Sequence, residues 1–571
     1  MGAGPEASEV TPVTPPRGDP AWPVWWPFAL FGAFALIAIS LYRDALLGPF
    51  LSDDIAYLVT HPYTAPLSLQ NVWEIFDPWG PAKLYAANYA PVHLLLTALE
   101  RHIFADALLG YHLVNLLVHA GNAVLVVAWL RTAGIRGVVA AGAGLFFLVH
   151  PANVEAVAWA SQLKTNASLA FALGALLALR RAPLVGAGLF ALSLLTKASG
   201  LFALPTAAVW LWAERGVSRR DFAWLGVWVA ITALYVIPQF ASFAHLGQVE
   251  VEAYADPWVH MRTVAAVGVR YLVMAPSAIG VSAWQEPDPV RSWLDPWWLA
   301  ALPLAGLLGW RLLSGLRGRR LEAAFWMAAA AAFAPISQIF PFPIPVADRY
   351  LYFILPGLLG GILLWGSDVT GRVSARLPGS LRDRGSAVAA AVALAWIIAL
   401  GWQTAQRAKI WQSETRLLLD AARHYPNGST ALILRARSAA QAGDVASAVE
   451  ALRNAADRGL DRFTALEQDP GLAPIRTTPE FRALMQEIAG RWIAMAQRRG
   501  YSTQPELRFL AIAHATRGEF AEAVEALEAA LAAGGPMDEL VRQELAAARA
   551  QLEATGEKPA GAGGVRGAPQ G

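Results

Sequence analysis

Residues 108–130, LLGYHLVNLLVHAGNAVLVVAWL, decide the fold class of this chain. The stretch contains no Asp, Glu, Lys or Arg, and about 20 such residues are enough for a helix to cross the hydrocarbon core of a bilayer. Because a segment inside lipid must satisfy its own main-chain hydrogen bonds, an α-helix is the structure expected here. The sequence therefore predicts a transmembrane helix at this position.

Comparable apolar runs recur up to residue 404, which predicts an all-α, polytopic membrane protein with about eleven spans. The other ten spans are expected near residues 24–42, 137–149, 167–179, 183–195, 200–213, 222–243, 296–312, 321–340, 350–366 and 386–404. Composition agrees, since 56% of the 571 residues are hydrophobic, only 15% are charged and the mean hydropathy is +0.40. A chain this apolar is not an ordinary soluble protein.

Composition also excludes several functions. The net charge is +2 and the basic residues form short clusters between apolar runs, so nothing favours nucleic-acid binding. The chain has no cysteine, which removes disulfides, thiol nucleophiles and thiolate metal sites.

Positive charge predicts which way the chain crosses, because Lys and Arg are retained on the cytoplasmic side. Two segments, 91–107 and 264–283, are ambiguous, since charged residues or a proline interrupt them. If neither crosses, the arginine clusters all fall on one side: Arg131 with Arg136, Arg180 with Arg181, Arg215 with Arg219 and Arg220, Arg311 to Arg320, and Arg372 to Arg384. We therefore predict a multi-pass protein of a bacterial inner (cytoplasmic) membrane, with the N-terminus in the cytoplasm.

The predicted domains are a disordered cytoplasmic tail over 1–21, a transmembrane domain over 22–404 with a first outward loop at 44–107, a periplasmic helical domain over 405–555, and a disordered tail over 556–571. Within the third part, residues 448–452 (AVEAL, after AGD) are echoed 75 residues later by 523–527 (AVEAL, after RGE). A glycine between paired helices and alternating Ala and Leu are typical of tetratricopeptide-like repeats. The spacing predicts a short, degenerate array.

The first outward loop opens with two adjacent carboxylates, Asp53 and Asp54. Adjacent residues on a helix do not share a face, so one of them is free to face a cavity while the other caps the helix or meets solvent. A carboxylate at an apolar boundary is suited to act as a general base toward a hydroxyl. The alternative is structural, with Ser52 or Asp53 capping an interfacial helix.

Polar residues also recur within one predicted span. His112, Asn115 and His119 are separated by three and four residues, so they share one helix face. Such a face either bonds neighbouring helices or lines a substrate path.

A third group lies at the outward ends of the predicted helices. Lys164, Lys197 and Arg349 converge on that side, where they are candidates for binding an anionic lipid headgroup; the alternative is snorkelling to ordinary phospholipid. Glu155 is either part of the site or a salt-bridge partner of Lys164, and His150 is either part of the site or a helix cap.

Taken together, these motifs resemble the transmembrane and tetratricopeptide-repeat family of O-mannosyltransferase-like proteins, within the integral-membrane glycosyltransferases of the GT-C fold. The residues that carry the resemblance are the Asp53-Asp54 loop, Tyr89-Ala90-Pro91, the His112 to His119 face, His150-Pro151 with Glu155 and Lys164, Lys197, and residues 348–352 (DRYLY). Their order along the chain, followed by Trp411 and a repeat region, extends the resemblance over nearly the whole sequence.

The resemblance implies transfer of a sugar, with mannose as the first candidate, from a polyprenyl-phosphate carrier to a protein or glycan acceptor. Asp53 or Asp54 would be the base. The residues implied to bind the donor phosphate are His150, Lys164, Lys197, Arg349 and Tyr352. A divalent metal ion, Mg²⁺ or Mn²⁺, would be held by Asp53 and Asp54 if one is used, although some relatives of the fold work without it.

Three positions depart from the family pattern: Ala90 and Leu163 stand where arginine is common, and Ala198 where an acid usually follows the lysine. These departures keep a second hypothesis open, a non-catalytic envelope scaffold that recruits partners through its repeats. A transporter of lipid-linked saccharides would predict inverted repeats and helices broken at mid-membrane, which the sequence does not suggest.

Overall fold

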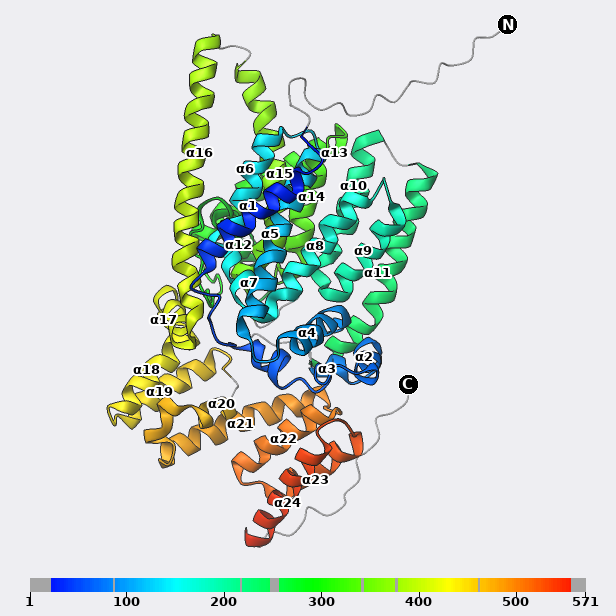
Figure 1. The fold of residues 1–571 in the computed structure, drawn as a ribbon. Coiled ribbons are helices and arrows are strands. Elements are labelled where there is room, and N and C mark those ends of the chain that lie inside the picture. Colours follow the sequence, from blue (N-terminus) through cyan, green and yellow to red (C-terminus); the bar gives the residue numbers. More distant parts are fainter. Residues whose placement is uncertain are drawn as a thin grey trace. The chain divides into compact units, whose positions relative to one another are not determined.

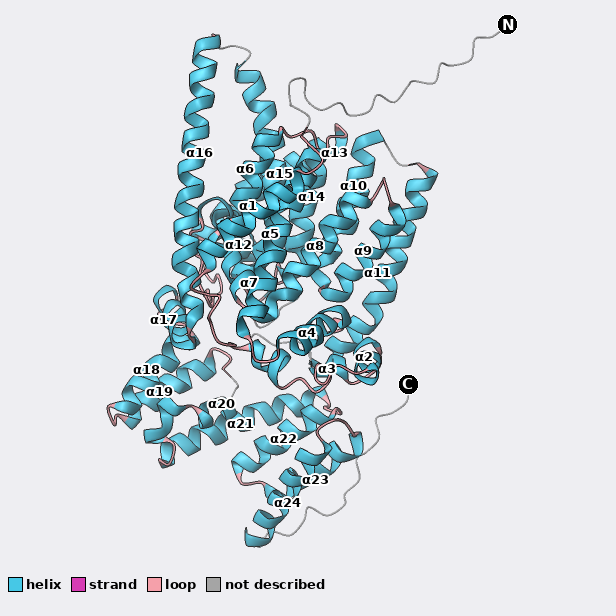
Figure 2. Cartoon of the chain, viewed as in Figure 1, coloured by secondary structure: helices cyan, strands magenta, loops and turns pink. Residues whose placement is uncertain are grey.

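The computed structural model describes residues 22–85, 88–215, 218–246, 256–339, 344–374, 378–460 and 463–555. Throughout these residues the secondary structure is helical, which confirms the all-α prediction (Figure 2). The chain forms two compact units: the first extends to Asp420, apart from the short stretch 243–247, and the second begins at Ala421. The second unit thus starts later than the predicted boundary at residue 405. Both tails predicted to be disordered lie outside the described residues.

The helices of the first unit follow the predicted spans closely. Those predicted as spans are α1 (Trp26–Tyr42), α5 (Leu108–Thr132), α6 (Gly137–Leu148), α8 (Leu163–Ala178), α9 (Pro183–Thr196), α10 (Ala203–Arg215), α11 (Arg219–Leu246), α13 (Pro296–Arg317), α14 (Glu322–Phe333), α15 (Leu351–Ser374) and α16 (Gly379–Ala408). The remaining helices are α2 (Leu69–Phe76), α3 (Ala82–Tyr85), α4 (Pro91–Phe104), α7 (Val154–Ala158), α12 (Pro257–Ser277) and α17 (Glu414–His424).

Five helical stretches in the described part of the chain are long and apolar enough to cross a membrane. They are 108–132, 219–242, 296–317, 348–373 and 383–412. The pair α6 and α7, bent by 50°, would make a sixth if it counts as one span. Helices α1, α9 and α14 are apolar but shorter. The protein therefore has the elements of a membrane protein, and the number of eleven spans stays a prediction.

Two of the predicted arginine clusters contact helices far from them in sequence; the helices that carry these contacts are labelled in Figure 1. Arg180, in the turn after α8, pairs with Glu214 at the end of α10. The guanidinium of Arg319 lies 4.3 Å from the ring centroid of Trp212, and Arg320 pairs with Asp368 of α15 at 2.9 Å. These contacts join segments far apart in sequence, and the predicted topology stays a prediction.

The ambiguous segment 264–283 falls mostly on α12, and both ends of this helix bond to segments at or next to the ends of predicted spans. His260 bonds to the main-chain oxygen of Gln338 at 2.5 Å, while His150 bonds to that of Ala275 at 2.9 Å. Between them, the hydroxyl of Tyr271 donates to the main-chain oxygen of Ala347 at 3.1 Å. These bonds join α12 to three segments that the topology predicts on one side, and a segment 264–283 that does not cross stays a prediction.

Close helix packing in the first unit depends on small residues. A Cβ at Gly357 of α15 would lie 2.6 Å from the main-chain nitrogen of Ala329 in α14, and one at Gly360 would lie 2.0 Å from the ring of Phe325. Helices in lipid gain no hydrophobic free energy by associating, because lipid tails are as apolar as the helix surfaces, so close van der Waals packing between small residues holds them together. The start of the outward loop is equally tight, since a Cβ at Gly48 would lie 2.7 Å from the main-chain oxygen of Trp411.

The second unit consists of antiparallel helix pairs. Its helices are α18 (Ser429–Gln441), α19 (Val445–Asp457), α20 (Phe463–Gln468), α21 (Pro479–Arg499), α22 (Gln504–Arg517), α23 (Phe520–Ala533) and α24 (Asp538–Thr555). The two echoed stretches lie on α19 and α23, each the second helix of a pair. Gly443 and Gly518 have φ of +77° and +82° in the turns that precede them, a conformation that glycine adopts without strain. This arrangement is compatible with the predicted repeats.

The topology is testable by labelling, because the chain has no cysteine. We expect Arg181→Cys and Arg317→Cys to react with a membrane-impermeant maleimide from one side of sealed vesicles, and Asp288→Cys and His102→Cys from the other. If α12 crossed the membrane, residues 181 and 317 would lie on opposite sides, and that result would contradict the topology.

Candidate functional site

The two adjacent carboxylates of the first loop differ in their environment. Asp54 is 1% exposed, and its carboxylate accepts main-chain N–H groups from Leu51 at 3.0 Å and Ser161 at 2.7 Å. Burial raises the pKa of Asp54 to about 6, although these two hydrogen bonds oppose the shift. Asp53 is only partly buried. Asp54 is therefore the structural member of the pair, and Asp53 is the one that can meet a substrate.

Asp54 connects the first loop to the segment that follows α7. The indole N–H of Trp159 donates to the main-chain oxygen of Leu51 at 3.0 Å, beside the bond from Ser161 to Asp54. Ser52, between these anchor points, has φ +52°, a strained value for a residue other than glycine. The chain is thus turned sharply just before Asp53, and contacts on both sides of the turn hold it in position.

Glu155 pairs with Arg349 and not with Lys164, which answers one question that the sequence left open. The Arg349 guanidinium forms an ion pair with Glu155, and the Arg349 main-chain N–H donates to the same carboxylate at 2.7 Å. Arg349 also lies over the ring of Trp159, 5.4 Å from its centroid. The same Trp159 indole donates to Leu51 at the start of the first loop, so the turn that carries Asp53 and the Glu155–Arg349 pair are both in contact with Trp159.

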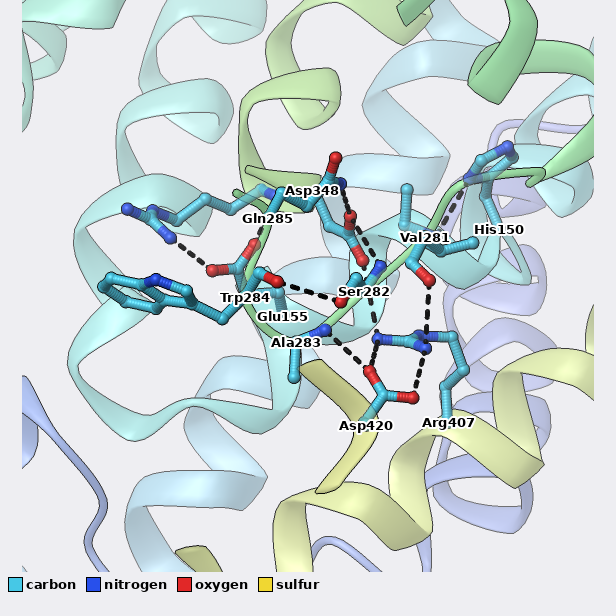
Figure 3. A network of polar contacts seen from close by, with 12 residues as sticks. His150, Glu155, Val281, Ser282, Ala283, Trp284, Gln285, Asp348, Arg407 and Asp420 are labelled. Atoms are coloured by element: carbon cyan, nitrogen blue, oxygen red, sulfur yellow. Dashed lines mark hydrogen bonds and ion pairs between the residues drawn. The ribbon is translucent and has the colours of Figure 1, made fainter. Parts of the chain in front are cut away.

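A second set of charges holds the segment 281–285 beside Glu155 (Figure 3). Asp348 accepts hydrogen bonds from the side chain of Gln285 and from the main-chain N–H of Ser282, and pairs with Arg407 at 3.6 Å. Arg407 in turn pairs with Asp420 at 3.3 Å. Buried ion pairs are tolerated when hydrogen bonds satisfy the remaining polar atoms, and this network meets that condition for both carboxylates.

Lys164 and Lys197 lie together on the same side as Arg349. The charges of Lys164 and Arg349 both act on Lys197, whose ammonium group donates to the hydroxyl of Thr165 at 2.7 Å. The ammonium of Lys164 lies 4.4 Å from the ring centroid of Tyr57 in the first loop. Within the described ranges neither lysine forms an ion pair with a carboxylate. The three predicted cations are therefore brought together, and only Arg349 is neutralised.

The polar face of α5 bonds to neighbouring segments. His112 bonds to the main-chain oxygen of Gly48 at 3.1 Å, and Asn115 donates to those of Trp159 and Ala160 at 3.1 and 3.0 Å. His119 bonds to the hydroxyl of Tyr352 at 2.8 Å. This is the first of the two roles that the sequence allowed.

Two residues predicted to bind the donor phosphate lie outside the cation cluster. Tyr352 is fully buried in the helix bundle, where Asn122 also donates to its hydroxyl at 3.0 Å. His150 is fully buried too; one ring nitrogen accepts from the main-chain N–H of Ala152 at 3.2 Å and the other bonds to Ala275. Both side chains thus have structural partners, and His150 caps a helical turn as the alternative interpretation predicted.

Sequence reasoning missed several residues of the site. Gln285 and Arg407 bond to Asp348, and Asp420 pairs with Arg407. All three lie in regions without a recognisable motif, and Arg407 and Asp420 fall where the repeat domain was predicted to begin. His93 and Glu100 lie on α4, in the segment that looked interfacial, and both are buried. Burial raises the pKa of Glu100 to about 8. The one available indication was that His93 closely follows Tyr89-Ala90-Pro91.

A metal ion held by Asp53 and Asp54 stays a prediction. Each oxygen of Asp54 accepts one main-chain N–H group, from Leu51 and from Ser161, and keeps a second lone pair. No group of three or more His, Asp or Glu side chains suited to a metal ion occurs among the residues that the structure describes. No step below depends on a metal ion.

The chain stands apart from known proteins in three comparisons. No known protein family, no curated protein and no solved structure matches it significantly. The inferences about function therefore rest on the residues and geometry of this chain.

The two aspartates are expected to respond differently to substitution. Asp54→Asn should lower the melting temperature, because an amide oxygen accepts only one of the two N–H groups and the other is left buried, which costs about 1–3 kcal/mol. Asp53→Asn, at a partly exposed position, should leave it nearly unchanged. Thermal unfolding of the purified variants tests both expectations, and equal destabilisation would contradict the assignment.

The pH dependence of stability provides an independent check on Asp54. Its pKa in the folded state, about 6, lies above the reference value of 3.8. The protonated form therefore stabilises the fold at low pH, and this contribution is lost as the pH rises through 6, by about 1 kcal/mol between pH 5 and pH 7. Asp54→Asn should remove this part of the pH dependence, which is measured by plotting the melting temperatures of wild type and variant against pH. Two parallel plots would contradict the prediction.

Proposed function

We propose that this protein is a membrane glycosyltransferase of the GT-C type, which moves a sugar from a polyprenyl-phosphate carrier to a hydroxyl of a protein or glycan. The observation that carries the proposal is a partly exposed carboxylate, Asp53, whose neighbour Asp54 is bonded to Ser161, three residues before Lys164. Lys164 and Lys197 form no ion pair within the described residues. A base and a cationic site for a phosphate are the two elements that such a reaction needs.

In the proposed reaction Asp53 takes the proton from the acceptor hydroxyl as its oxygen bonds to the anomeric carbon of the donor sugar. The bond between that carbon and the phosphate oxygen breaks at the same time, and its electron pair leaves with polyprenyl phosphate. Lys164 and Lys197 stabilise the negative charge that develops on the departing phosphate. Displacement from the opposite face inverts the configuration of the anomeric carbon.

The unpaired lysines favour an enzyme over a scaffold. Placing an ammonium group in a partly buried site without a carboxylate costs free energy, so a membrane anchor gains nothing from two of them. In a donor site the lost hydration is replaced when the phosphate binds. The neutralisation of Arg349 by Glu155 leaves Lys164 and Lys197 as the groups that attract the anion, which makes them the proposed donor-binding residues.

The remaining features of the proposal follow the sequence resemblance. We place the protein in a bacterial inner membrane with about eleven spans, with the site and the C-terminal unit in the periplasm. The helix pairs of the second unit would act as tetratricopeptide-like repeats that bind the acceptor. Mannose is the first sugar to test.

The decisive experiment measures release of polyprenyl phosphate from polyprenyl-phosphate-linked mannose and other sugars by the purified protein in detergent. We expect Asp53→Asn to slow turnover by about 100-fold or more, as loss of a general base does, at an unchanged melting temperature. Asp106→Asn, at an exposed carboxylate of the same loop, is the matched control and should keep wild-type turnover.

Two results would overturn the proposal in different ways. Wild-type turnover by Asp53→Asn would remove Asp53 from the role of base. A folded wild-type protein that neither turns over nor binds any polyprenyl-phosphate sugar would leave the scaffold as the better explanation, to be tested by deleting the second unit.

A further inference from the structure

His93 is a buried histidine that lacks a hydrogen-bond partner among the described residues. It lies at the start of α4, is 1% exposed, and neither of its ring nitrogens bonds to another atom in the part of the chain that the structure describes. Its ring packs edge-on against Tyr57, with 5.0 Å between the ring centroids. Nearly all buried polar side chains in proteins are hydrogen-bonded, so an exception of this kind calls for an explanation.

The surroundings of His93 are positively charged. Burial, together with the charges of Lys164, His61 and Lys197, holds the pKa of His93 well below its usual range. A neutral imidazole has one N–H donor and one acceptor nitrogen. Lys164 contacts the same Tyr57 ring as His93, with its ammonium group 4.4 Å from the ring centroid.

This combination suits one class of ligand. Two ammonium groups without carboxylate partners attract an anion, and a neutral imidazole supplies a directional N–H for an anionic oxygen. Hydrogen bonds to charged acceptors are stronger than those between neutral groups, so the ligand would satisfy a donor that is otherwise unpaired. Phosphate has several oxygens, enough for both ammonium groups and the imidazole.

We infer that His93, together with Lys164 and Lys197, binds the phosphate group of a prenyl-phosphate ligand, with the imidazole N–H of His93 donating to a phosphate oxygen. The inference rests on the proposed function and assigns His93 to its donor site. The two lysines attract the anion, and the hydrogen bond from the His93 N–H orients the phosphate group. A free phosphate ion presents the same oxygens, and the experiment below distinguishes the two sources.

The test exploits the missing hydrogen-bond partners of His93. His93→Phe keeps the ring that packs on Tyr57 and removes the polar nitrogens, so the ligand-free protein should be as stable as wild type or more stable. The same variant should bind farnesyl phosphate at least about tenfold more weakly, measured by calorimetry in detergent. His93→Gln, which keeps an N–H donor, should bind it more tightly than His93→Phe does.

Two ligand controls accompany the variants. Farnesol, which lacks the phosphate, should bind wild type and His93→Phe equally, because the prenyl chain does not meet the imidazole. If inorganic phosphate binds wild type as tightly as farnesyl phosphate does, the site is one for free phosphate and the prenyl assignment is overturned. His102→Phe, at an exposed histidine of the same helix, is the matched control and should change neither stability nor binding.

A purely structural histidine, for example one that holds a buried water, would give the reverse pattern. His93→Phe would then lower the melting temperature and leave the affinity for farnesyl phosphate unchanged, and this result would overturn the inference. If His93→Phe does not fold, His93→Leu provides the same comparison.

Failure of this inference can be told apart from failure of the proposed function. Binding of farnesyl phosphate that depends on His93, without sugar transfer from any donor, would support the phosphate site and argue against the glycosyltransferase. Transfer that depends on Asp53 but is unaffected in affinity and rate by His93→Phe would support the enzyme and remove His93 from its donor site.

Discussion

The buried pair of Glu155 and Arg349 is the interaction on which the outward end of the first unit depends. Glu155 follows the bend after α6, and Arg349 stands at the start of α15, so the pair joins segments almost 200 residues apart. Asp348, next to Arg349, extends the connection to 282–285, Arg407 and Asp420. Removing either partner of such a pair leaves a charge without compensation in a site that water does not reach, which costs several kcal/mol.

This pairing also determines the charge that a ligand would meet. Of the three cations, Arg349 is neutralised by Glu155, whereas Lys164 and Lys197 form no ion pair within the described residues. Asp54 also has a structural partner, because its carboxylate accepts two main-chain N–H groups, while Asp53 beside it is only partly buried. In each set one member is held by bonds within the structure, and the other is the one we propose for chemistry.

The candidate site shows how far sequence patterns reach. The grouping of Lys164, Lys197 and Arg349 was predictable, because the predicted topology places all three on the same side of the membrane. The assignment of roles within the motifs was not. Adjacent aspartates look equivalent in sequence, and Tyr352 and His150 read as site residues, although the structure gives each of them a structural partner inside the bundle. The sequence contains only a weak indication of His93, because a buried side chain without a hydrogen-bond partner is recognised only from the packed structure.

The sequence by itself determined that the chain is all helical and where its apolar helices lie. These properties are local or additive: hydrophobicity, helix length and charge depend on residues within one segment, and the bilayer constrains each segment separately. Only the tertiary structure decided that Glu155 pairs with Arg349, that Asp54 is buried while Asp53 is only partly buried, and that α12 bonds to Gln338 and Ala347. These contacts join residues 76 or more positions apart, and such contacts form only when many helices have packed together.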